Sequence, residues 1–126
     1  MVRAIRGATT VTENCEKDIL DATGELLEKM LEKNGIKESD IISIIFSVTP
    51  DLNAAFPAAA ARRMGLDKVA LMCVNEIDVP GSLKKCIRIL IHFNSDREMR
   101  DLKFVYLKDA QKLRPDIYEK NANVEE

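Results

Sequence analysis

The sequence has few of the residues on which acid–base, metal or nucleophilic chemistry usually depends. His92 is the one histidine among 126 residues, and the chain has no tryptophan. A single histidine excludes sites built from several histidines and leaves little material for a Ser-His-Asp arrangement. The three cysteines, Cys15, Cys73 and Cys86, are odd in number and lack the paired spacing of a metal site. The sequence therefore predicts no metal or cofactor, and reduced thiols in a cytoplasmic protein.

Long apolar runs and long basic runs are also absent. No stretch reaches the roughly 20 apolar residues that cross a bilayer, and residues 1–10 lack the pattern of a signal peptide. The net charge is −2, and basic residues do not alternate with aromatic ones, which disfavours nucleic-acid binding. The chain is 46% apolar and 32% charged, as in an ordinary globular protein, and its length predicts one domain.

Hydrophobic periodicity predicts five strands and two helices in the order β-α-β-α-β-β-β. Pro57 is expected to begin the second helix, which is rich in alanine and ends at Gly65. The β-branched segment 41–48 is expected to be a central strand. The expected strands cover residues 2–10, 41–48, 69–74, 86–93 and 104–107.

The first helix is the clearest element, because apolar residues recur at three- and four-residue spacing between Ile19 and Leu31. Thr12 is its expected N-cap, and Asn34-Gly35 is expected to end it. Gly24 lowers the helix propensity, which indicates close packing at that turn.

The strand at residues 86–93 has two faces of different character. One layer of helices covers one face of a mixed sheet, and the other face is too apolar to remain in water. We therefore expect an α+β fold with a five-stranded mixed sheet, helices on one face, and identical subunits covering the other. The first face consists of Ile87, Ile89, Ile91 and Phe93, and the second of Cys86, Arg88, Leu90 and His92.

Two arginines, Arg6 and Arg88, lie within apolar segments that are predicted to be strands. A buried guanidinium cannot lose its charge and costs several kcal/mol unless an anion pairs with it. Glu76 supplies one carboxylate, and the neighbouring segments contain few others. We therefore expect a small anionic ligand to supply the missing negative charge.

Each candidate residue also has an ordinary structural interpretation. Arg88 can be a solvated residue on an exposed strand face, and an isolated Glu76 is more often a loop or salt-bridge carboxylate. Tyr106 would ordinarily be a half-buried core aromatic, and Cys73 a small core residue. Composition and spacing leave these alternatives open.

Seven short segments form a pattern that runs from the first expected strand to Asp116. They are Arg3-Ala-Ile-Arg-Gly-Ala-Thr-Thr10, Thr49-Pro-Asp-Leu52, Phe56-Pro-Ala58, Glu76-Ile-Asp78, Leu83-Lys-Lys-Cys-Ile-Arg88, Val105-Tyr-Leu107 and Leu113-Arg-Pro-Asp116. In order and spacing they resemble the monofunctional, trimeric chorismate mutases of the α/β-barrel class. Each segment alone is weak, but seven in register are hard to explain by accident.

The resemblance implies a cofactor-independent Claisen rearrangement of chorismate to prephenate, a step towards phenylalanine and tyrosine. It also implies a homotrimer, in which the sheets close a pseudo-barrel and each active site lies between adjacent subunits. Arg88 would face the ether oxygen of the breaking bond, and Glu76 would contact the hydroxyl end of the substrate. The other implied substrate contacts are Arg6, Tyr106, Cys73, Phe56, Ala58, Arg62, Leu113 and Arg114.

Two positions depart from the pattern of this family. Ala59 stands where a lysine is common, and Met72 replaces a small polar threonine. The first change removes a positive charge at the cleft mouth, for which Arg62 can compensate. Residues 1–116 are expected to form the single domain, and residues 117–126 a flexible tail.

Two other functions remain open at this point. Small trimeric enzymes that hydrolyse reactive enamines or imines share a related assembly and use an arginine for a substrate carboxylate. A non-catalytic module would bind chorismate or another dicarboxylate without converting it. The combination of Glu76, Arg88 and Tyr106 favours the mutase.

Overall fold

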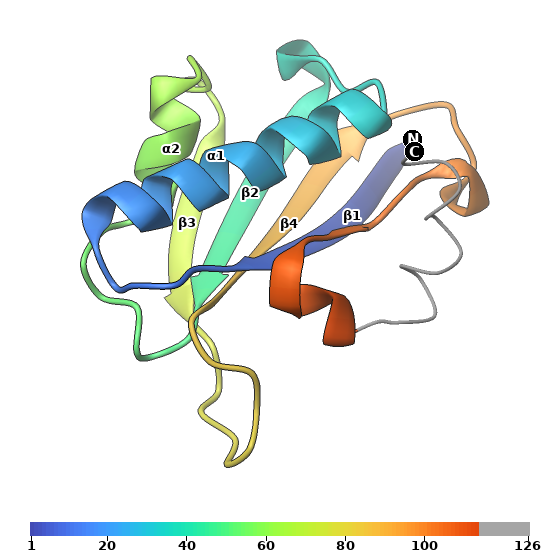
Figure 1. Ribbon diagram of the computed structural model, residues 1–126. Coiled ribbons are helices and arrows are strands. Elements are labelled where there is room, and N and C mark those ends of the chain that lie inside the picture. The colour runs from blue at the N-terminus through green and yellow to red at the C-terminus, as the bar shows by residue number, and fades with distance from the viewer. Residues whose placement is uncertain (114–126) are drawn as a thin grey trace.

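A computed structural model describes residues 1–113 and has the predicted α+β fold (Figure 1). The described residues contain no helix with the length and apolar character that a membrane span requires. Arg114, the expected domain boundary at residue 116 and the expected tail lie outside the described residues. The strands and α-helices are β1 (Val2–Thr10), α1 (Glu16–Lys33), β2 (Ile41–Val48), α2 (Ala58–Arg63), β3 (Ala70–Asn75), β4 (Cys86–Asn94) and β5 (Val105–Tyr106), and the 3-10 helices are η1 (Glu38–Asp40), η2 (Met99–Asp101) and η3 (Lys108–Lys112).

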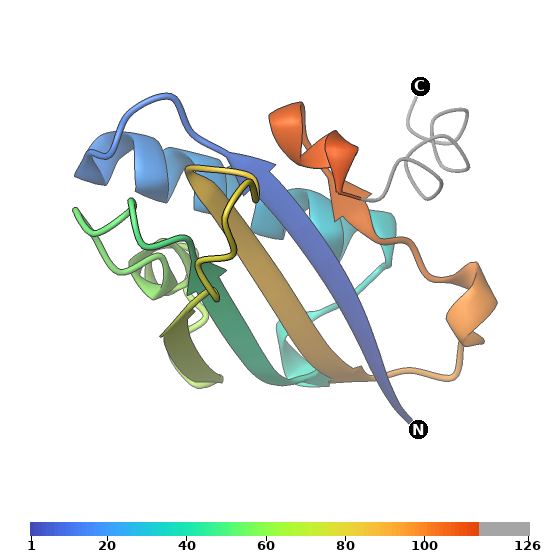
Figure 2. The same ribbon diagram turned by 90° about the horizontal axis from the view of Figure 1, so that it is seen from below.

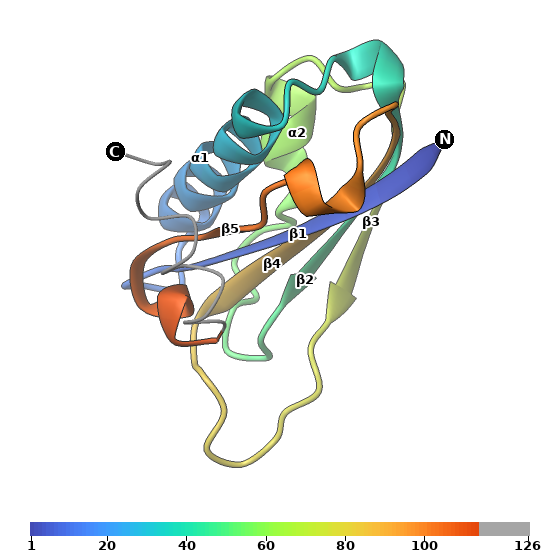
Figure 3. The ribbon, with the colours of Figure 1, turned by 90° about the vertical axis from the view of Figure 1, so that its right-hand side faces the viewer.

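The five strands form one mixed sheet with the spatial order β3-β2-β4-β1-β5. Strand β4 is antiparallel to both β1 and β2, whereas β3 runs parallel to β2 and β5 runs parallel to β1. Helices α1 and α2 lie on the same side of this sheet (Figure 3), as predicted. We call this side the helix face and the opposite side, seen in Figure 2, the open face.

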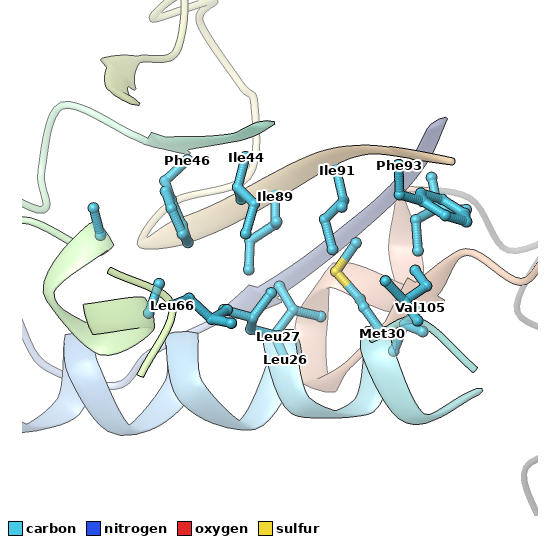
Figure 4. Packing of buried hydrophobic residues seen from close by; sticks show 14 of the residues in the cluster. Leu26, Leu27, Met30, Ile44, Phe46, Leu66, Ile89, Ile91, Phe93 and Val105 are labelled. Carbon is cyan, nitrogen blue, oxygen red and sulfur yellow. The ribbon is translucent and has the colours of Figure 1, made fainter. Parts of the chain in front are cut away.

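The core lies between the helix face and α1. The residues of β4 that were predicted to share a face, Ile87, Ile89, Ile91 and Phe93, are all buried. Figure 4 shows that several of them point towards the apolar side of α1. Each such side chain contributes about 1.5–3 kcal/mol through removal of apolar surface from water. The helix side of this contact includes Leu26, Leu27 and Met30.

Two glycines differ in what surrounds them. A Cβ added at Gly7 would lie 2.6 Å from Met30 Sδ and 2.9 Å from the Val105 carbonyl oxygen. Strand β1 can therefore pack directly against α1 and β5 because this residue has no side chain. A Cβ added at Gly24 would meet nothing within 4 Å, so the prediction of close packing at that turn is wrong.

Helix α1 begins later than the sequence predicts. Its N-cap is Cys15, which makes no side-chain capping bond, so Thr12 is not the N-cap. The Thr12 carbonyl oxygen accepts a hydrogen bond from Lys85 Nζ, and the Asn14 side chain accepts from the N–H groups of residues 53 and 54. These contacts with other loops hold the segment outside the helix. The predicted end is confirmed, since Asn34 caps the helix.

Strand β3 is at the edge of the sheet and remains largely exposed in the single chain. Met72 is 60% exposed and Val74 is 41% exposed, although the strand is mostly apolar. The loop that follows, residues 76–85, extends away from the rest of the molecule (Figures 1 and 3). Ile77 in this loop is 85% exposed. Apolar surface of this extent is typical of a surface that another chain covers.

Candidate active site

A cavity of about 240 Å³ lies on the open face of the sheet. It brings together four of the side chains that the sequence singled out: Arg6, Glu76, Arg88 and Tyr106. We call it the open-face cavity. Its volume is somewhat below the roughly 300–1,000 Å³ that is typical of ligand sites.

The sheet register explains why these residues meet. Residue Ala8 of β1 is opposite Arg88 of β4, and Arg6 is opposite Leu90, so both arginines lie on the open face. Glu76 follows β3 directly, and its N–H donates a 2.9 Å hydrogen bond to the Val48 carbonyl oxygen at the end of β2. The carboxylate then reaches Arg88, with 2.9 Å between Glu76 Oε2 and Arg88 Nε.

Both members of this ion pair are partly exposed in the single chain. The Arg88 side chain is 44% exposed and the Glu76 side chain is 27% exposed. The Arg6 guanidinium lies 5.6 Å from the centroid of the Phe104 ring, a cation–π distance. The expectation that the arginines are buried is therefore not met by one chain. The cost of burying their charges arises only when a ligand or a neighbouring chain covers the open face.

Tyr106 reaches the cavity from β5 and is 7% exposed. It packs in a small cluster with Ala8 and Cys86, against which Leu113 lies at the end of η3. Burial raises the pKa of the Cys86 thiol, although Arg88 acts in the opposite direction. Cys86 is therefore a neutral packing residue that supports the cavity wall.

Three other expected contacts, Phe56, Arg62 and Cys73, lie on the opposite side of the sheet. A second cavity of about 490 Å³, which we call the helix-side cavity, is lined in part by Phe56, Ala59, Arg62 and Cys73. Cys73 is beside Phe46 in the register of β3 and β2 and packs against the core. One chain therefore does not bring Cys73 to the cavity that holds the acid–arginine pair.

Two further positions are placed by the same geometry. Ala58 is 4% exposed and belongs to the core instead of lining the helix-side cavity. Met72 neighbours Cys73 in sequence, but successive residues of a strand point to opposite faces. The departure at Met72 therefore changes an exposed edge of the open face, and the departure at Ala59 changes the wall of the helix-side cavity.

A third cavity, of about 300 Å³, lies beside α1 and is lined by Asp18, Asp21, Glu25 and Lys108, among others. Lys108 Nζ is 3.8 Å from a carboxylate oxygen of Glu25, so its charge is already partly compensated. The excess of carboxylates would repel a dicarboxylate ligand. The two arginines make the open-face cavity the better anion site.

Some wall residues were not predicted. Ile45 and Ser47 of β2 line the open-face cavity. Ser47 is opposite Arg88 in the antiparallel register. That register is the signal that identifies them, and it depends on strand pairing between distant segments, which the sequence alone does not give.

Comparison with known proteins places this geometry in a family. Residues 2–117 match the family described as chorismate mutase type I. The chain is 49% identical over 118 residues to "Chorismate mutase AroH" of Thermus thermophilus, which covers 93% of this chain and 97% of the relative. It is 45% identical over 118 residues to "Chorismate mutase AroH" of Bacillus subtilis (strain 168), with 93% of each chain covered.

A solved structure agrees with these relatives. The chorismate mutase from Clostridium thermocellum is 60% identical to this chain and superposes with a TM-score of 0.86. The match covers 87% of this chain and 98% of the other. Family match, sequence identity and fold all agree, and the chain belongs to the type I chorismate mutase family.

Proposed function

We propose that this chain converts chorismate to prephenate without a cofactor, in the biosynthesis of phenylalanine and tyrosine. The observation that carries the proposal is the open-face cavity. There, in a chain of the chorismate mutase type I family, two arginines, a glutamate and a tyrosine come together. Chorismate carries two carboxylates, an ether oxygen and a hydroxyl group. Fixed cations and hydrogen-bonding groups are what such a substrate needs.

Arg88 is the proposed catalytic cation. The rearrangement is unimolecular, and negative charge grows on the ether oxygen as the C–O bond breaks. A guanidinium held beside that oxygen stabilises the transition state more than the ground state. Arg6 and Tyr106, from the neighbouring strands of the same cavity, would hold a carboxylate and the ring side of the substrate. This positioning selects the conformer in which the reacting carbons are close.

Glu76 has two proposed roles in this scheme. Its carboxylate orients the Arg88 guanidinium through the 2.9 Å contact. It would also accept a hydrogen bond from the substrate hydroxyl and favour partial positive charge on the departing ring. Neither role moves a proton between the protein and the substrate.

The complete site is proposed to lie between neighbouring copies of the chain. The open-face and helix-side cavities are on opposite sides of one sheet, so the residues lining them can enclose one ligand only if they come from two chains. A contact between two different surfaces is heterologous, and repetition of such a contact forms a ring when the rotation between neighbours closes. We propose a ring of three, with the sheets closing a pseudo-barrel.

Exposed apolar residues support this assembly. Phe56 beside the helix-side cavity is 73% exposed, and Met72 on the edge strand is 60% exposed. Burial of such side chains against a second chain would supply much of the association energy. The free cysteines, Cys15, Cys73 and Cys86, support a reducing location such as the cytoplasm.

The activity is tested by following the absorbance of chorismate with purified protein and no added cofactor. We expect first-order loss of chorismate and formation of prephenate. Saturable binding without conversion would identify a binding module and overturn the proposal. Release of ammonia from an imino acid, with no turnover of chorismate, would favour the deaminase-like alternative.

The shared site is tested by mixing two impaired variants, Arg88→Ala and Arg62→Ala, after joint unfolding and refolding. Each variant damages one of the two surfaces. A ring that contains both variants has some sites with an intact Arg88 from one chain and an intact Arg62 from the next. We expect recovery of about one quarter of the wild-type activity from an equal mixture. No recovery beyond the two parents would place both residues in one chain's site.

A further inference from the structure

A small group of hydrogen bonds joins the end of β2 to the start of β4. Thr49 follows β2, and its N–H donates to the Cys86 carbonyl oxygen at 3.0 Å. The Thr49 hydroxyl oxygen accepts a 3.0 Å hydrogen bond from the Cys86 N–H. One residue therefore pairs with both backbone polar groups at the beginning of the strand that carries Arg88.

Asp51 fixes the orientation of the Thr49 side chain. The Thr49 hydroxyl donates its proton to Asp51 Oδ1. The same carboxylate accepts the Lys85 N–H, at 2.9 Å from Oδ2 and 3.2 Å from Oδ1. Because the hydroxyl has a single proton, donation to Asp51 leaves its lone pairs available to the Cys86 N–H. We call Thr49, Asp51, Lys85 and Cys86 the Thr49 corner.

The corner also holds an unusual backbone conformation. Lys85 has φ +48°, in the left-handed region that residues with a side chain seldom adopt. Its N–H is bound by Asp51, its carbonyl oxygen accepts the Val11 N–H at 3.0 Å, and its Nζ donates to the Thr12 carbonyl oxygen at 3.0 Å. A turn held from several sides sets the direction in which the chain enters β4.

The corner adjoins both members of the proposed catalytic pair. Arg88 is two residues beyond Cys86, on the same face of β4. The Glu76 N–H binds the carbonyl oxygen of Val48, the residue before Thr49. The backbones that carry the two side chains are therefore both anchored to residues 48 and 49.

From this arrangement we infer that Thr49 and Asp51 are positioning residues, which set the placement of Arg88 relative to Glu76. The inference rests on the proposed function, because it assigns a catalytic consequence to that placement. Displacement of a catalytic group by about 1 Å can lower the rate by about 10²-fold. Loss of the corner is therefore expected to reduce kcat more than it changes KM, since the substrate-binding groups from β1 and β5 are unaffected.

The test compares Thr49→Val with Thr49→Ser, measuring kcat, KM for chorismate and the thermal unfolding midpoint. Valine has the shape of threonine but no hydroxyl, whereas serine retains it. We expect kcat to fall about 10-fold or more in Thr49→Val, with KM changed less than about threefold, and serine to restore most of the rate. Thr23→Val is the matched control, because the buried Thr23 hydroxyl donates only to the Ile19 carbonyl oxygen within α1.

The outcomes separate the inference from the proposed function. A lower unfolding midpoint in Thr49→Val, with kcat equal to that of Thr49→Ser and Thr23→Val, would overturn the positioning role while the wild-type activity stands. An inactive wild-type protein would overturn the proposed function and the inference together. Should Thr49→Val fail to fold, Asp51→Asn provides the same comparison, because the amide keeps the size of the side chain but loses the charge. Normal kcat in folded Asp51→Asn would then overturn the inference.

Discussion

Arg88 Nε lies 2.9 Å from Glu76 Oε2, although Arg88 is in β4 and Glu76 directly follows β3, two strands that are not neighbours in the sheet. Ion pairs that are exposed to this degree contribute only about 0–1 kcal/mol to stability, because water and salt screen the charges. The main effect of this ion pair is therefore on the orientation of the Arg88 side chain and not on the stability of the fold. Glu76 holds the guanidinium in one direction before the substrate arrives.

Replacement of Glu76 by glutamine should reduce turnover with little effect on stability. A hydrogen bond to a charged group is worth about 1.5–3 kcal/mol, so its weakening is expected to lower kcat about 10-fold or more. The free energy of unfolding should change by less than about 1 kcal/mol. Asp21→Asn is the control, since it disrupts the 2.7 Å Lys17–Asp21 ion pair on α1 by the same chemical change. Equal turnover in the two variants would contradict the assigned role.

Alanine at the two contrasting glycines should change stability in opposite directions. Gly7→Ala forces a methyl group against Met30 and the rigid Val105 carbonyl, which is expected to cost about 1–3 kcal/mol. Gly24→Ala adds a methyl group in open space within α1 and should stabilise by roughly 0.5–1 kcal/mol. Denaturant unfolding at one fixed protein concentration measures both. A stabilised Gly7→Ala protein would contradict the packing of β1 described above.

The loss of folding stability at acidic pH should depend in part on Asp51. Burial raises the pKa of this carboxyl group, but hydrogen bonds from Thr49 and from the Lys85 N–H outweigh burial and leave the pKa below its ordinary value. Because the folded state binds the proton less readily, the carboxylate stabilises the fold above the ordinary pKa of about 3.9. That contribution is lost as the pH falls through the lower folded-state pKa.

The stability of the wild-type protein is therefore compared with that of Asp51→Asn at about pH 6 and at about pH 3. We expect the wild-type advantage in unfolding free energy at the higher pH to shrink at the lower one. An advantage that is the same at both pH values would show that ionised Asp51 is not what stabilises this corner.

Turnover should be nearly independent of pH between about 6 and 9. The proposed reaction transfers no proton to or from the protein, and arginine and glutamate side chains ordinarily keep their charges across this range. Measurement of kcat at saturating chorismate tests this expectation. A bell-shaped profile centred near neutrality would indicate acid–base catalysis and contradict the mechanism.

Much of the fold follows from patterns within single segments. The alternation of Ile87, Ile89 and Ile91 gave the buried face of β4, and the periodicity between Ile19 and Leu31 gave α1. These predictions succeeded because burial of one face is a local property of a strand or helix. The predicted Thr12 N-cap was wrong because Thr12 and the nearby Asn14 bind distant loops, which no local pattern reveals.

The arrangement of the candidate site could be predicted less well from patterns within single segments. Arg6, Glu76, Arg88 and Tyr106 were all singled out, but their meeting in one cavity depends on strand pairing across most of the chain. Cys73 was expected to contact the substrate, and within one chain the alternation of β3 places it on the face opposite to the open-face cavity. The Thr49 corner also escaped prediction, because Thr49-Pro50-Asp51 reads locally as the end of a strand.

The central claim is that the fixed positive charge of Arg88 stabilises the developing charge on the substrate, and kcat of Arg88→Ala tests it most directly. Arg63→Ala, at the end of α2, serves as the matched control. With assembly of both variants verified by their mass in solution, the account predicts a fall of about 10²–10³-fold in kcat for Arg88→Ala and none for Arg63→Ala. A correctly assembled Arg88→Ala protein that turns over chorismate at a near wild-type rate would contradict the account.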